Sequence, residues 1–296
     1  MKPTVTRLPL MLLGLGLVAV LVFVAAPRQA EADTATVSWT EGFEGYTACP
    51  DVPTHCDNID PALRTDLYFP SSNWTHSGLR DTFVYTDRPH EGSQVLKAHG
   101  LNDSYGASIA YRAIGGYPPY EIDFWAQSIG DRALLPTGGF RKTVGVELGT
   151  GPTFTSYHRG LLSFTVEDLF PVGSPDRQDL EIWGGFLETD ESYLNGEYLG
   201  LWQGNNYHHI NIKYEPVTGD HTKVRITWTV DNRPPVSRVY DVNWYENSLD
   251  YIGLWAAGGQ VWFDHITVTS ASEPFFFDTP DAPELNEKVY LPLITR

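Results

Sequence analysis

The chain has 296 residues and a formal net charge of −17, with 19% charged and 13% aromatic residues. Such an acidic chain repels nucleic acids, anionic membranes and acidic polymers, and this argues against those partners. The charge instead suits neutral glycans, cationic partners or Ca²⁺. With 27 glycines and 21 prolines, the composition favours a turn-rich β protein over a helical one.

The N-terminus has the pattern of an export signal. Lys2 and Arg7 precede an uncharged apolar run over residues 8–26, and small residues suited to cleavage follow at positions 30–32. We therefore expect a signal peptide over residues 1–32 and a protein that works outside the cell or at its surface. The apolar run is longer than usual for a signal peptide, so an uncleaved membrane anchor is the alternative. No later stretch is long enough to span a membrane.

The two cysteines agree with export. Cys49 and Cys56 bracket a short loop that contains prolines. In an oxidising compartment such a pair is expected to form a disulfide, which would pin a surface loop. Two free thiols or part of a metal site are the alternatives.

Short β runs follow one another from about residue 37 to residue 270. They alternate polar and apolar residues, are rich in β-branched and aromatic side chains, and are separated by turn residues at a spacing typical of sandwiches. The runs are VSWTEGF, TFVYT, QVLKAH, ASIAYRAI, YEIDFWAQ, KTVGVELG, LLSFTVEDL, LEIWGGFL, YHHINIKYE, TKVRITWTV, SRVYDVNW and QVWFDHITVTS. No shift in composition marks a linker, and this predicts one β-sandwich domain over residues 33–270.

The last residues differ in character. Residues 271–296 are acidic and rich in proline and end in an apolar stretch. This composition predicts a linker followed by a short C-terminal tail. A last strand that docks on the sandwich is the alternative.

Four segments resemble those of laminin-G-like and pentraxin-like domains. YEIDFWAQ (120–127) is similar to their Phe-Trp strand, and residues 207–235 to their His-His-Val strand with its hairpin. VSWTEGFEGY (37–46) resembles their opening strand and residues 251–270 their closing strand. The resemblance implies a concanavalin A-like jelly roll, which is an all-β sandwich of two antiparallel sheets with one concave face. Lectins, glucanases and polysaccharide lyases share this fold, so the fold alone does not choose a function.

The strand over residues 120–127 carries the first candidate site. Alternation places Glu121, Asp123 and Trp125 on one face and the apolar residues on the other. The opposite set is expected in the core: Tyr120, Ile122, Phe124 and Ala126.

A glycosidase would need a second carboxyl group about 5–5.5 Å from the first. The strand also resembles a laminarinase motif, which would make Glu121 the nucleophile and Asp123 its helper. The acid/base position then falls on Trp125 or Ala126, and neither can transfer a proton. Glu147 or Glu181 would have to supply the proton from another strand, so hydrolysis is disfavoured.

The same residues fit sugar binding, because a pyranose ring stacks on an aromatic face while carboxylates accept hydrogen bonds from its hydroxyls. Trp125 has Glu121 and Asp123 on its face, and Glu181 shares a face with Trp183. If both faces lie on the concave sheet, they form one acidic, aromatic groove. The alternative is that both tryptophans are packed under loops.

Other chemistries have weaker support. Alginate-type lyases of this fold use a Tyr/His pair with basic residues, and their motifs do not appear in the sequence. Neighbouring His208 and His209 point to opposite faces of a strand and cannot bind one metal together. The resemblance implies that a structural Ca²⁺ could be present, and the loops offer hard oxygen donors at Asp57, Asp60, Asp190, Glu191 and Asn195. No other cofactor is expected.

The sequence thus predicts an exported, non-catalytic module that binds a glycan or cell-surface polysaccharide. A glycoside hydrolase or polysaccharide lyase of the same fold is the first alternative. A structural exported module without a ligand is the second.

Overall fold

The computed structural model describes ten segments of the chain. They cover residues 36–49, 68–78, 82–99, 107–129, 140–153, 156–168, 181–186, 196–201, 206–257 and 260–282. All of them belong to the compact unit that begins at Thr34. The expected signal peptide and Cys56 lie outside the described residues, so export and the disulfide stay predictions.

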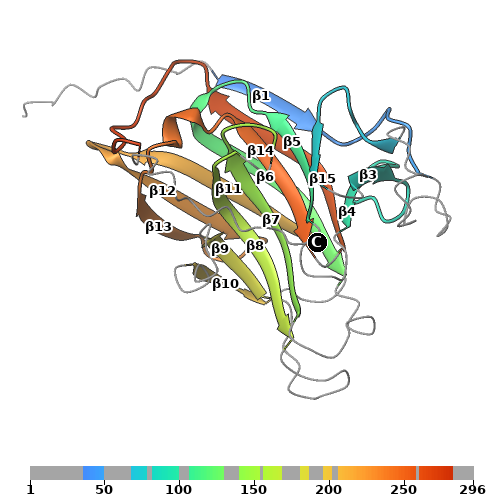
Figure 1. Ribbon diagram of the computed structural model, residues 1–296. Helices are drawn as coiled ribbons and strands as arrows, with labels where there is room; N and C mark the ends of the chain where they lie inside the picture. Colours follow the sequence, from blue (N-terminus) through green and yellow to red (C-terminus); the bar gives the residue numbers. More distant parts are fainter. Residues whose placement is uncertain are drawn as a thin grey trace, which may run out of the picture. The chain divides into compact units, whose positions relative to one another are not determined.

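An eight-stranded antiparallel sheet forms one layer of this unit (Figure 1). Its strand order is β13-β12-β11-β6-β15-β4-β3, and β1 pairs with β15 beside that path. The strands are β1 (Thr36–Glu41), β3 (Thr82–Tyr85), β4 (Val95–His99), β6 (Tyr117–Ile129), β11 (His208–Val217), β12 (Asp220–Val230), β13 (Val236–Asp241) and β15 (Gln260–Ala271).

A seven-stranded antiparallel sheet forms the second layer, in the order β10-β9-β8-β7-β14-β5-β2. Its strands are β2 (Thr75–Gly78), β5 (Ala107–Ala113), β7 (Phe140–Gly149), β8 (His158–Asp168), β9 (Glu181–Phe186), β10 (Glu197–Leu201) and β14 (Tyr251–Ala257). A short 3-10 helix, η4 (Glu246–Ser248), precedes β14. No helix in the described segments is long and apolar enough to cross a membrane. The two layers confirm the predicted all-β sandwich of two antiparallel sheets.

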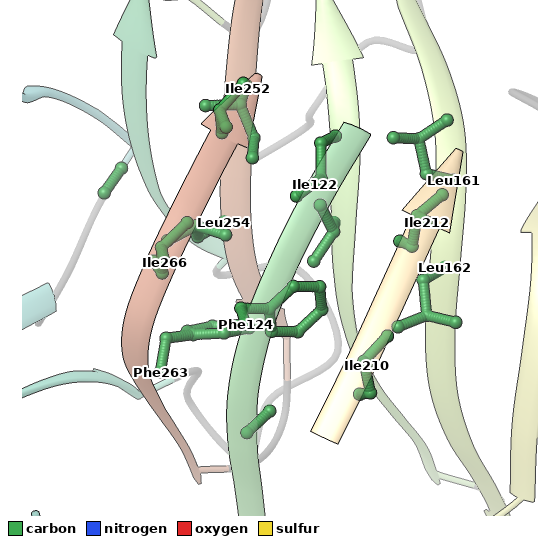
Figure 2. Close-up of a cluster of buried hydrophobic side chains, with 14 of the residues drawn as sticks. Ile122, Phe124, Leu161, Leu162, Ile210, Ile212, Ile252, Leu254, Phe263 and Ile266 are labelled. Carbon is green, nitrogen blue, oxygen red and sulfur yellow. The ribbon is translucent and has the colours of Figure 1, made fainter. Parts of the chain in front are cut away.

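The core lies between the sheets and follows from strand alternation. The apolar face of β6 is fully buried at Ile122 and Phe124, as the sequence predicts. Ile210 and Ile212 of β11 lie beside them, and Leu254 of β14 meets them from the other sheet (Figure 2). At about 25 cal/mol per Å² of apolar surface removed from water, this interlayer packing is the main stabilising term of the fold.

The opening and closing segments behave partly as the resemblance implies. β1 pairs with β15 from Thr36 opposite Ala271 to Glu41 opposite Ile266, so the expected meeting of the first and last strands is confirmed. The closing segment over residues 251–270, however, is two strands in different sheets. β14 ends at Ala257 in the seven-stranded layer and β15 begins at Gln260 in the eight-stranded layer. In the sequence, a Gly-Gly pair at residues 258–259 separates the two runs.

Part of the C-terminal region packs on the sandwich. Phe277 is buried at 3% exposure and exchanges two hydrogen bonds with Asn247, from its backbone N–H at 2.7 Å and to its carbonyl at 2.9 Å. The Asp278 N–H also donates to the His221 carbonyl at 3.0 Å. The predicted linker and tail over residues 271–296 thus begin with docked residues. Residues 283–296 lie outside the described part of the chain.

A buried ion pair ties the two layers to the loop before β14. Arg159 of β8 donates from Nε to Glu246 Oε1 at 2.8 Å, and Tyr214 of β11 donates its hydroxyl to the other Glu246 oxygen. Arg159 and Glu246 are almost fully buried. Burial, followed by the Glu246 charge, raises the pKa of Tyr214 well above its ordinary value, so the phenol remains a donor.

Removing one partner of this buried pair should destabilise the fold strongly. We expect Arg159→Met to lower the free energy of unfolding by about 3–5 kcal/mol, because Glu246 would be left as an uncompensated buried charge. Lys223→Met is the matched control, since Lys223 pairs with Asp241 in solvent and should leave the unfolding midpoint unchanged. Urea unfolding of both variants checks this, and equal losses would contradict it.

Candidate functional site

The outer face of the eight-stranded sheet carries the two acids of β6. Glu121 Oε1 and Asp123 Oδ2 both accept from the amide nitrogen of Asn211, at 2.9 and 3.1 Å. Asp123 Oδ1 lies 2.9 Å from His209 Nε2, and Glu121 lies 3.6 Å from Lys213 Nζ. Both carboxylates thus have polar or charged partners on the neighbouring strand β11.

Hydroxyl side chains extend this polar face across further strands. The register aligns Asn211 and Asp123 with Thr267 of β15 and Thr40 of β1, and the two threonine hydroxyls lie 3.0 Å apart. A second row along β15 and β1 joins Thr269 to Ser38 at 3.3 Å. Such a face is what an antiparallel sheet presents to water when its other side is buried.

Trp125 is not an open platform on this face. The His90 ring stacks on it with centroids 3.9 Å apart and an interplanar angle of 15°, and the His209 ring centroid lies 4.8 Å away. The loop that carries His90 is attached to β15, because the backbone N–H groups of His90 and Glu91 donate to Asp264 Oδ2 at 2.8 and 3.1 Å. Trp125 therefore matches the packing alternative more closely than the sugar-stacking one.

The outer face of the seven-stranded sheet is different, because aromatic side chains follow one line of its register. Tyr198 of β10 lies opposite Trp183 of β9, and their ring centroids are 5.3 Å apart. Continuing across the sheet, the register leads through Ser163 of β8 and Gly145 of β7 to Trp255 of β14. Tyr198 is 48% exposed, and both tryptophans are partly exposed. We call Tyr198, Trp183 and Trp255 the aromatic row.

Glycines let two aromatic rings lie flat on this sheet. A Cβ atom at Gly145 would lie 2.6 Å from Trp255 Cε2, and one at Gly253 would lie 2.6 Å from Tyr111 Cε1. Real Cβ contacts essentially never come this close, so both positions require glycine while the rings stay in place. The indole of Trp255 therefore reaches across β7 toward Trp183.

A polar cluster lies next to the aromatic row, because Glu147 is the next outward-facing residue after Gly145 on β7. Tyr111 donates its hydroxyl to Glu147 Oε1 at 2.8 Å, and His158 Nδ1 lies 3.2 Å from the same oxygen. All three side chains are largely buried. Burial, followed by the Glu147 charge, raises the pKa of Tyr111, while burial lowers the pKa of His158. Tyr111 is therefore a hydrogen-bond donor at neutral pH.

An arginine covers the outer edge of the strand that begins the row. Arg233 donates from Nη1 to the Leu199 carbonyl and from Nη2 to the Leu201 carbonyl, both at 2.9 Å. These carbonyls belong to β10, the last strand of the seven-stranded sheet. The guanidinium thus occupies acceptors that the sheet leaves unpaired at its edge.

The residues predicted from sequence are divided between the two faces. Glu121, Asp123 and Trp125 lie on β6 in the eight-stranded sheet, whereas Glu181 and Trp183 belong to β9 in the other. The two sets therefore form no common groove. The side chain of Glu181 lies outside the described part.

The same division separates the suggested glycosidase partners. Glu147 of β7 faces outward from the seven-stranded sheet, and Glu121 faces outward from the other. Packed sheets are ~10 Å apart, so these carboxyl groups point away from each other across the core and cannot reach the ~5–5.5 Å of a retaining pair. Glu147 cannot complete a site with Glu121, and Glu181 also belongs to the seven-stranded sheet.

The histidine pair follows the prediction. His208 is buried, with Nδ1 2.7 Å from Asp231 Oδ2, and His209 points outward to Asp123. Within the described segments no group of three or more histidine, cysteine or acidic residues could hold a metal ion. The five loop donors proposed for Ca²⁺ lie outside those segments, so that site stays a prediction. They are Asp57, Asp60, Asp190, Glu191 and Asn195.

Sequence reasoning missed three members of the outward face: Tyr111, Tyr198 and Trp255. The signal for Trp255 is present in the run YIGLWAA, where alternation places Tyr251, Gly253 and Trp255 on one side. It was hidden because the whole segment resembles a single closing strand. Tyr198 lies on a short strand next to Gly200, whose φ of +114° interrupts the alternation.

Comparison with known proteins finds only distant likenesses among solved structures. No family model matches the chain, and no curated protein matches it. Among solved structures, the alginate lyase Aly36B covers 78% of this chain and 96% of its own, with 12% identity and a TM-score of 0.46. A Lotus tetragonolobus seed lectin covers 70% and 97%, with 12% identity and a TM-score of 0.42. Peanut lectin covers 81% and 100%, with 10% identity and a TM-score of 0.45. At such identities these likenesses concern the fold alone.

The glycine under Tyr111 gives a test of the outward face. Gly253→Ala should lower the free energy of unfolding by about 1–3 kcal/mol, because the added methyl group would collide with Tyr111 and Glu147. Gly42→Ala is the matched control, since a Cβ there has nothing within 4 Å, and it should change stability by less than about 0.5 kcal/mol. Chemical unfolding measures both. A Gly253→Ala variant as stable as the parent would show that the ring does not lie on the strand.

Proposed function

We propose that the protein is a non-catalytic carbohydrate-binding module and that the outer face of the seven-stranded sheet is its binding surface. The aromatic row carries this proposal. Sugar rings present flat apolar C–H surfaces, and aromatic rings held at the surface of a rigid sheet stack on them with little loss of conformational entropy.

The surroundings of the row support the proposal. Tyr111, Glu147 and His158 lie next to the aromatic rings, but they are largely buried and contact one another, so they fix the sheet surface beside the row. The outer face of the eight-stranded sheet offers no open indole in its described part, because Trp125 is stacked under His90 and Trp262 is only 2% exposed.

Binding without catalysis is favoured by the carboxylates. The Glu147 carboxylate is buried and accepts a hydrogen bond from Tyr111, so it is not open to a glycosidic bond. The raised pKa of Tyr111 also opposes its use as a base at neutral pH.

We place this module outside the cell, where the N-terminal signal would deliver it and where Cys49 and Cys56 would be oxidised. Adhesion to a polysaccharide at a cell surface is the role that combines export with sugar binding.

Truncating the row should remove binding. On a glycan array of the mature domain, Trp183→Ala and Tyr198→Ala should each lower the affinity for the bound glycan roughly 10- to 30-fold, or about 1.4–2 kcal/mol. Tyr117→Ala is the matched control, because Tyr117 is also exposed, at 39%, but lies on β6 of the other sheet.

Retained binding in both row variants would contradict the proposal. So would an equal loss in Tyr117→Ala, since that result would point to the other face.

An enzyme of the same fold is the second candidate, and the Tyr111–Glu147–His158 cluster is the observation that favours it. Incubation of the array ligand with the protein separates the two functions. New reducing ends without ultraviolet absorbance would indicate hydrolysis, and new reducing ends together with the ultraviolet absorbance of an unsaturated product would indicate elimination. A binding module should give neither.

A further inference from the structure

The aromatic row crosses the strands, and this direction limits what it can hold. Tyr198, Trp183 and Trp255 belong to β10, β9 and β14, so they are distributed along the hydrogen-bonding direction of the sheet. Neighbouring strands lie ~4.8 Å apart, which is close to the length that one pyranose residue adds to a glycan chain. A chain that lies across the strands would therefore place about one sugar on each.

The two indoles are too far apart for a single sugar. The backbone positions of Trp183 and Trp255 are separated by three strand spacings, or roughly 14 Å. The Trp255 indole covers Gly145 of β7 and so shortens the gap by about one strand. One strand, β8, still lies between the rings. A monosaccharide on either indole leaves the other without a contact.

The charges near the row oppose acidic sugars. Arg112 follows Tyr111 and Arg159 follows His158, but alternation turns both arginines into the core. Arg112 donates to Glu41 at 2.8 Å, and Arg159 donates to Glu246. The described charged groups beside the row are the Glu147 carboxylate on β7 and the Arg233 guanidinium, which two β10 carbonyls hold at the edge of the sheet. A uronate bound over Trp255 would therefore face the Glu147 charge three strands away from Arg233.

The net charge agrees with this argument. The chain as a whole has a formal charge of −17, and its field repels polyanions at long range.

We infer that this face binds an uncharged polysaccharide chain that lies across the strands, with about four sugar residues in contact from Tyr198 to Trp255. The inference rests on the proposed function and adds the length and the charge of the ligand.

Calorimetric titration with defined oligosaccharides tests both properties. The probes are β-1,3- and β-1,4-linked oligomers of glucose, mannose, xylose and galactose from one to six residues, and oligogalacturonates of equal length. We expect affinity for a neutral series to rise at least tenfold from one to four residues and then to level off. Oligogalacturonates of four residues should bind at least tenfold more weakly than the neutral tetramer.

Two variants locate the chain on the row. Trp183→Ala and Trp255→Phe should each lower the affinity for the tetramer at least fivefold and flatten its dependence on length. Tyr117→Ala should match the parent protein. Circular dichroism confirms that each variant is folded, and the Phe substitution keeps an aromatic ring over Gly145.

The outcomes separate the inference from the proposed function. A monosaccharide that binds as tightly as the tetramer, or a salt-sensitive oligogalacturonate that binds more tightly, overturns the inference. If Trp183→Ala still weakens that binding, the proposed function survives. Binding to none of the oligosaccharides overturns both.

Discussion

The alternation of side chains along strands that share one core governs every other feature of this protein. Because Ile122 and Phe124 pack against the opposite layer, the residues next to them on β6 face outward. The same rule turns Arg112 and Arg159 into the interior, where each must find a carboxylate. The chemistry of both outer faces is thus decided by the packing between the sheets.

The two outer faces differ because the sheets differ in what alternation leaves outside. The eight-stranded sheet presents hydroxyl, amide and carboxylate groups that satisfy one another across strands, as Asn211 does for Glu121 and Asp123. The seven-stranded sheet presents aromatic rings and glycines. Water solvates the first face well, whereas the second exposes apolar area that a ligand could cover.

Much of the fold follows from short-range patterns, while the site depends on sheet membership. The apolar face of β6, the β11–β12 hairpin and the pairing of β1 with β15 could all be predicted from alternation and a resemblance. The relation between Trp125 and Trp183 could not, because two strands with the same local pattern can belong to either layer. The stacking of His90 on Trp125 was equally hidden, since it depends on a loop held by the distant residue Asp264.

The Arg233 guanidinium has a consequence for how copies of this protein coexist at high density. Exposed strand edges recruit one another, and the proposed adhesive role would concentrate copies of the protein at one surface. By occupying the Leu199 and Leu201 carbonyls, Arg233 removes acceptors that a second chain would need to extend the sheet at β10. Tyr198, on that same strand, is then left to the solvent even in a crowded layer.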